Sequence, residues 1–82
     1  MATSTIEASR VIEIDGTIPD ATGDMTVSNF LPTGFRPICG YYLTTYNQYR
    51  PVAVGFSGTT LILQSVTAGQ ANRPLKVLAC KV

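Results

Sequence analysis

Short runs of β-forming residues, separated by glycine and proline, constrain the fold of this chain most. Apolar side chains on one face of a helix recur with a period of about 3.6 residues, and no long stretch keeps that period. β-branched and aromatic residues gather instead in short runs, with turn residues about every 8 to 12 positions. This spacing predicts an all-β domain, built as a small antiparallel β-sandwich.

The runs predict strands at residues 10–14, 24–28, 38–46, 52–56, 59–65 and 75–82. Turns are expected at Asp15-Gly16, at Ser57-Gly58 and at a hairpin tip over 46–49, and a loop or single helical turn at 66–72.

Two of these strands carry a clear pattern of faces. Leu61 and Leu63 point to one side and Ile62 to the other, which is typical of a strand with one buried face. The last strand is largely apolar on both faces, so it needs a second layer, either another sheet or another subunit. Gly40, inside a predicted strand, indicates a bulge or a close backbone approach.

Residues 30–37, Phe-Leu-Pro-Thr-Gly-Phe-Arg-Pro, hold the densest group of conformationally restricted residues. Each proline lacks a backbone N–H and fixes φ, so neither suits a central strand, and the glycine is free to adopt a positive φ. We expect a rigid, extended corner, anchored by Phe30 and Phe35. The residues predicted to form it are Pro32, Gly34, Phe35, Arg36 and Pro37.

The size and the low charge limit the organisation of the chain. Its 82 residues suit one domain, which we place at 10–82, after an N-terminal arm at 1–9. Only 13% of the residues are charged, against about 25% in a typical soluble domain. Such a surface favours an oligomer that covers apolar faces between subunits, and a monomer with a polar, uncharged surface is the alternative.

Charge is distributed unevenly along the sequence. All five acids lie within the first 24 residues, and five of the six bases follow them, although the net charge is only +1. The acidic segment is therefore expected either to face a neighbouring subunit or to fold back on its own chain. The small net charge predicts no nucleic-acid partner. No apolar run reaches the roughly 20 residues that span a bilayer, so membrane insertion is not expected.

The sequence offers little for catalysis or for holding a cofactor. It has no histidine, no glycine-rich phosphate loop and no complete calcium loop, since the acids of 20–24 are better explained as solvated turn residues. Cys39 and Cys80 match no zinc or redox spacing and are expected to be small buried hydrophobes, with a disulfide conceivable only if their strands are adjacent. We therefore expect no enzyme, no metal and no cofactor.

Tyrosines provide the best candidate for a binding surface. Four of them lie within nine residues, and each offers a flat apolar ring with a hydroxyl group. Sugars present C–H faces that stack on such rings and hydroxyls that need amide or guanidinium partners. The predicted ligand-binding residues are Tyr46, Asn47, Gln48, Tyr49 and Arg50. The alternative is a polar hairpin, with Tyr41 or Tyr42 in the core.

Two motifs resemble a known class of proteins. Leu31-Pro32-Thr33-Gly34-Phe35-Arg36-Pro37 is followed, after a hairpin, by Phe56-Ser57-Gly58-Thr59-Thr60-Leu61-Ile62-Leu63 and a final apolar strand. This order resembles the C-terminal domains of tail-fibre and baseplate receptor-binding proteins of tailed bacteriophages, over roughly residues 24–82.

The resemblance implies a trimeric β-sandwich or jelly roll in a phage virion that binds a host-surface saccharide or protein at the tail tip. It also implies a homotrimer, contacts with other virion proteins and synthesis in the bacterial cytoplasm. Cytoplasmic synthesis agrees with an N-terminus that lacks the basic and apolar regions of a signal peptide. A structural protein that decorates the capsid or caps the baseplate, with residues 1–9 as its arm, is one alternative. A cellular carbohydrate-binding module is another.

Overall fold

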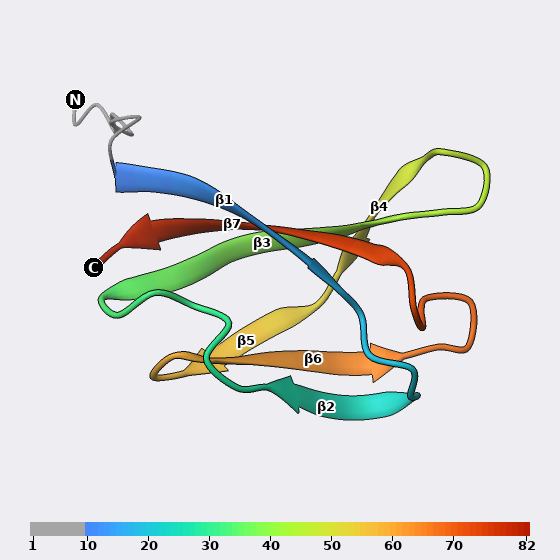
Figure 1. Cartoon of the computed structure of the whole chain (residues 1–82), viewed down its shortest axis with the longest axis horizontal. Coiled ribbons are helices and arrows are strands. Elements are labelled where there is room, and N and C mark those ends of the chain that lie inside the picture. Colours follow the sequence, from blue (N-terminus) through green and yellow to red (C-terminus); the bar gives the residue numbers. More distant parts are fainter. Residues whose placement is uncertain (1–9) are drawn as a thin grey trace, which may run out of the picture.

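Two antiparallel β-sheets packed in layers make up the fold (Figure 1). The computed structural model describes residues 10–82, so the arm predicted at 1–9 lies outside the described residues. Residues 10–82 form seven strands joined by turns and loops, with no α-helix between them. The strands are β1 (Val11–Thr17), β2 (Gly23–Val27), β3 (Phe35–Leu43), β4 (Tyr49–Val52), β5 (Val54–Ser57), β6 (Thr60–Val66) and β7 (Pro74–Lys81).

The strand order places distant parts of the sequence side by side. Sheet A has the order β1-β7-β3-β4, and sheet B has the order β2-β6-β5. From β1 in sheet A, the chain therefore crosses to sheet B for β2 and returns to sheet A for β3. The all-β sandwich expected from the sequence is confirmed.

The core lies between the two sheets and is built by alternation. Leu61 and Leu63 of β6 face Leu75 and Val77 of β7, and each of the four side chains is almost completely buried. Ile62 lies on the opposite face of β6, as the pattern of that strand predicts. Burial of aliphatic side chains at about 25 cal/mol per Å² is the main stabilising contribution here.

The first strand is longer than its sequence predicts. Asp15 and Gly16, expected to form a turn, continue β1 and pair with Lys76 and Leu75 of β7. Gly16 lies beneath the ring of Phe30, and a Cβ at this position would lie 2.6 Å from the ring carbon Cε2. Pairing with β7 and packing against this ring therefore override the local turn preference of Asp-Gly.

The strand predicted at 52–56 is divided between the two sheets. It breaks at Ala53, so that β4 belongs to sheet A and β5 to sheet B (Figure 1). Val52 and Val54 both contact the core, one from each layer. The alternation of apolar residues continues from Val52 to Val54 across the break, so the sequence pattern did not reveal the change of sheet.

The turn predicted at Ser57-Gly58 lies one residue later in the structure. The two-residue turn before β6 consists of Gly58 and Thr59, because Ser57 pairs with Thr60. Gly58 has a φ of 60°, which suits a residue without a side chain.

The predicted corner is a tight turn and not an extended segment. The Phe35 N–H donates to the Pro32 carbonyl at 3.1 Å, and Gly34 adopts a φ of 84° at the third position. Both aromatic anchors are half-buried, and Phe30 packs against the core. Leu31 is also buried, and its N–H donates to the Thr59 carbonyl at 3.0 Å.

Pro37 lies within β3 and not outside the sheet. It is opposite Ala79 of β7, whereas β4 pairs with β3 only from Gly40 onward, so no β4 residue faces the missing N–H. The register shifts between Pro37 and Cys39, which makes Ile38 the extra residue of a bulge. Gly40 marks a close approach, since a Cβ there would lie 2.7 Å from Val54 Cγ1.

Candidate functional site

The outer face of sheet A, turned away from sheet B, holds the candidate site. Leu75, Val77 and Ala79 of β7 point into the core, so the alternate residues Lys76 and Leu78 point outward. The register places outward residues of the neighbouring strands beside them. Lys76 lies opposite Asp15 and Tyr41, and Leu78 lies opposite Glu13 and Cys39.

An open depression of about 350 Å³ lies on this face. The residues that line it are Glu13, Tyr41, Tyr49, Lys76 and Leu78. They come from all four strands of sheet A, and Tyr41 and Tyr49 expose 38% and 54% of their surfaces. Two accessible rings thus meet a charged pair above an apolar floor.

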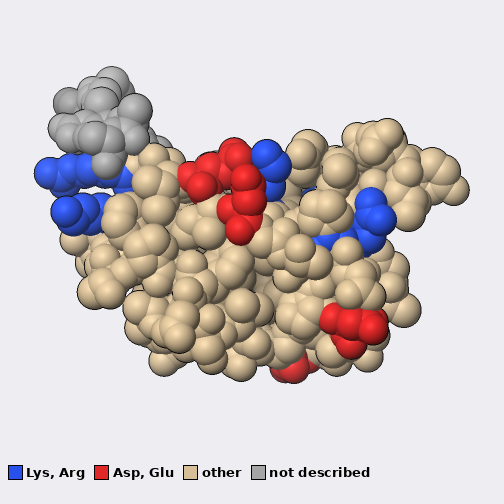
Figure 2. Space-filling view, viewed as in Figure 1, with Lys and Arg blue, Asp and Glu red and all other residues tan. Residues whose placement is uncertain are grey.

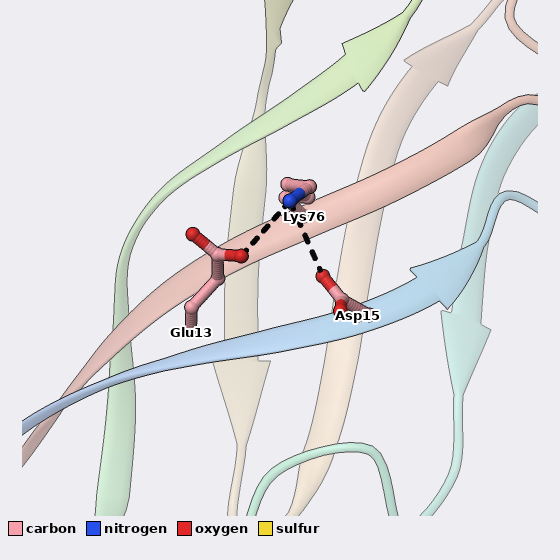
Figure 3. Close-up of polar contacts among 3 residues, drawn as sticks. All are labelled: Glu13, Asp15 and Lys76. Carbon is pink, nitrogen blue, oxygen red and sulfur yellow. Dashed lines mark hydrogen bonds and ion pairs between the residues drawn. The ribbon is translucent and has the colours of Figure 1, made fainter.

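The charged groups of the depression contact one another directly (Figure 3). The Nζ of Lys76 lies 3.0 Å from Glu13 Oε1 and 3.8 Å from Asp15 Oδ1. The same atom lies 5.9 Å from the centre of the Tyr49 ring, within cation–π range. These contacts fix the position of the ammonium group against one wall of the depression.

Two groups in the depression have shifted pKa values. The hydrogen bond to Glu13 raises the pKa of Lys76, and the charges of Glu13, Tyr49 and Asp15 raise it further. A side-chain hydrogen bond with Cys39 raises the pKa of Tyr41, as does the charge that Cys39 gains on ionisation. Lys76 is therefore cationic at neutral pH, and the Tyr41 hydroxyl keeps its proton.

The hairpin between β3 and β4 carries the tip predicted to bind a ligand, and it projects from one end of sheet A (Figure 1). Thr44 organises this tip: its Oγ1 accepts from the N–H groups of Tyr46 at 3.3 Å and Gln48 at 3.1 Å. Asn47 takes a φ of 61°, which asparagine tolerates better than most residues. Tyr46 is 85% exposed, so the tip predicted from the sequence is an accessible surface.

The structure divides the five predicted binding residues. Tyr49 lines the depression, whereas Tyr46, Asn47 and Gln48 occupy the tip. Arg50 is exposed but opposes Tyr42, on the other face of β4 from Tyr49. Tyr42 itself packs against the core, which agrees with the alternative that Tyr41 or Tyr42 is a core residue.

Sequence reasoning did not place Glu13, Lys76 or Leu78 in a binding site. The available signal was alternation, since an acid and a lysine at alternate positions of strands mark solvent-facing sides. Their meeting depends on β1 pairing with β7, 63 positions apart for Glu13 and Lys76. No local pattern predicts such a pairing.

Several charged side chains form contacts within the chain. Glu13 and Asp15 pair with Lys76 of the same chain, which is the intramolecular alternative considered from the sequence. Arg73 donates from Nε to the carbonyl of Leu43, the last residue of β3, at 2.7 Å. Figure 2 shows the charged groups in small, separated patches, with a wide uncharged surface between them.

The cysteines are not in the core. Cys39 and Cys80 are half-buried free thiols, and the register places both on the outer face of sheet A. They were expected inside because they lie within apolar runs. Both outer positions border Leu78, so an apolar run here reflects a sheet face that is only partly exposed.

Within residues 10–82, no three histidine, cysteine or acidic side chains are grouped closely enough to hold a metal ion. The described part of the chain likewise has no helix long and apolar enough to cross a membrane. Comparison of the chain with models of protein families, with curated proteins and with solved structures found no match.

Proposed function

We propose that this protein is a non-catalytic recognition domain of a phage virion, which binds a saccharide on the host surface at the tail tip. One observation carries the saccharide part of the proposal: the rings of Tyr41 and Tyr49 are accessible in one depression beside Glu13 and Lys76. Sugar rings stack their C–H faces on such side chains, and charged groups at the rim bind the hydroxyls. The virion context rests on the resemblance of the two sequence motifs.

The position of the depression suits recognition. Its residues project from paired strands of sheet A, so the backbone beneath them is held by ladder hydrogen bonds. The exposed tip lies at the end of the same β3–β4 hairpin and offers the amide groups of Asn47 and Gln48 to a longer saccharide. A small rigid site of this kind would bind one sugar weakly.

Assembly into a homotrimer is part of the proposal. Ile38 and Phe56 expose 48% and 47% of their surfaces, and covering such residues between subunits would remove apolar surface from water. Three linked sites would then raise the affinity through effective concentration. Sedimentation equilibrium should give a mass three times that of the chain, and a monomer at all concentrations would contradict this part.

The test is retention of the labelled protein on bacterial cells, with purified phage capsids as a competing surface. Retention on cells of one host, competed by polysaccharide from that host, is the expected result. Retention on capsids alone would instead indicate a structural virion protein. A soluble glycan bound by a monomer would favour a cellular carbohydrate-binding module.

Two tyrosine variants then locate the site. Tyr49→Ala should abolish retention, because it removes one ring of the depression, and its surface position should leave the fold intact. Tyr46→Ala removes a more exposed ring that lies outside the depression and should have the smaller effect. Loss of retention in Tyr46→Ala alone would move the site to the tip.

A further inference from the structure

The charge of Lys76 is already balanced by its own chain. Its ammonium lies within 4 Å of two carboxylates, at 3.0 Å from Glu13 and 3.8 Å from Asp15 (Figure 3). Counting these three side chains, the charge beside the two tyrosine rings is −1 at neutral pH. A lysine next to exposed aromatic rings would ordinarily suggest an acidic ligand, and here the surroundings reverse that expectation.

The two carboxylates are more exposed to solvent than the lysine side chain that they bind. The side chain of Lys76 is 38% exposed, whereas those of Glu13 and Asp15 are 50% and 74% exposed. The ammonium is also held over the Tyr49 ring. A ligand entering the depression therefore meets carboxylate oxygens at least as readily as the ammonium.

We infer that the depression selects saccharides that carry no carboxylate and discriminates against acidic ones. This inference rests on the proposed function, since it names the class of sugar for that same site. Hydroxyl groups donate well to the two carboxylates, and each donation leaves the ion pairs with Lys76 in place. The carboxylate of an acidic sugar would lie close to two like charges, and the nearby ammonium of Lys76 is already paired with them.

The expected discrimination is moderate, because all three groups are exposed to water. Unit charges several ångströms apart near a protein surface interact enough to change affinity by about three- to tenfold. Salt should reduce the effect, since the Debye length is about 8 Å at physiological ionic strength. A preference that persists unchanged at high salt would point to a cause other than charge.

The experiment compares matched sugars by NMR, with the ring resonances of Tyr41 and Tyr49 assigned through Tyr→Phe variants. Methyl glucoside and methyl galactoside are titrated beside the corresponding methyl glucuronide and methyl galacturonide, which differ only by a carboxylate at C6. At low salt the neutral glycoside of a pair should bind about three- to tenfold more tightly. Equal or tighter binding of the uronide would overturn the inference.

Charge variants provide the second arm. Glu13→Gln combined with Asp15→Asn changes the local charge from −1 to +1 and frees the ammonium of Lys76, so the uronide should now bind more tightly than the neutral glycoside. Asp20→Asn, in the loop after β1, removes an acid outside the depression and should leave the preference unchanged. A double variant that still prefers the neutral sugar would contradict the electrostatic cause.

Failure of the inference and failure of the proposed function give different results. Shifts of both rings with every sugar, and with no preference, would refute the selectivity while supporting a saccharide site. No shift of either ring with any of the four glycosides, while the protein stays folded, would refute the saccharide site and the selectivity together.

Discussion

The Nε atom of Arg73 donates a hydrogen bond of 2.7 Å to the carbonyl oxygen of Leu43. The bond joins the loop before β7 to the last residue of β3, where the projecting hairpin begins. Loss of a partly buried bond of this kind should lower the free energy of unfolding by about 1–2 kcal/mol. We therefore expect Arg73→Ala to be destabilised by this amount in urea unfolding.

Arg36→Ala is the matched control for Arg73→Ala, because Arg36 is exposed and also precedes a proline. It should unfold at nearly the same urea concentration as the wild type. Equal destabilisation by both substitutions would show that the bond to Leu43 has no particular role.

Gly40 should not tolerate a side chain. A Cβ there would lie 2.7 Å from Val54 Cγ1 and 3.2 Å from Val52 Cγ1, in the packed region between the sheets. Overpacking of this kind costs about 1–3 kcal/mol, which thermal unfolding of Gly40→Ala should show as a lowered Tm. Gly69→Ala, whose Cβ would come no closer than 4.0 Å to another residue, should keep the wild-type Tm.

Thr44 should hold the hairpin tip in place. Thr44→Val removes the oxygen that accepts from the amides of Tyr46 and Gln48, so these amides should exchange hydrogen several-fold faster than in the wild type. Thr44→Ser keeps the hydroxyl and should retain slow exchange. If Thr44→Val exchanged at the wild-type rate, the tip would owe its order to the backbone bonds alone.

Stability should decline at high pH through Lys76. Glu13 raises the pKa of Lys76 above its ordinary value of 10.5, so above that pH the folded chain binds more protons than the unfolded one. The stabilisation is complete below 10.5 and is lost as the pH rises through the folded pKa. Tyr41 contributes in the same direction above its ordinary value of 10.0, because its pKa is also raised.

The measurement is Tm against pH for the wild type and for Lys76→Met. The two curves should converge above the folded pKa of Lys76, and added salt should reduce the difference between them at lower pH. Parallel curves across the whole range would show that the ion pairs do not affect stability.

The two cysteines should remain free thiols under mild oxidation. Cys39 lies opposite Leu78 and Cys80 lies opposite Arg36, so the cysteines are diagonal neighbours on β3 and β7. Such positions are about 7–8 Å apart, beyond the usual Cα separation of a disulfide. Mass spectrometry of the alkylated, folded protein should show two modified thiols, and a monomer lighter by two hydrogens would contradict the register.

The sequence predicted the fold class because alternation is a local property. Leu61 and Leu63 are buried where the pattern placed them, and the close approach at Gly40 was also anticipated. The turn predicted at Asp15-Gly16 was wrong, because pairing with β7 outweighs the turn preference of these two residues. This error came from a contact between two segments that lie far apart in the chain.

The candidate site was less predictable for the same reason. Tyr49 was anticipated from its residue type, but Lys76 and Glu13 join it only through the strand order β1-β7-β3-β4. Arg50 was included on chemistry alone, and the alternation of β4 directs it to the other face. Residue chemistry therefore indicated the kind of site, and topology selected most of its members.

The change of sheet at Ala53 has a mechanical consequence. β4 begins at Tyr49 and ends at Val52, and after the single residue Ala53 the chain enters β5, which pairs with β6. A pull on a ligand held at Tyr49 would therefore be passed directly to sheet B and would not simply peel β4 from the edge of sheet A. Both layers would share such a load.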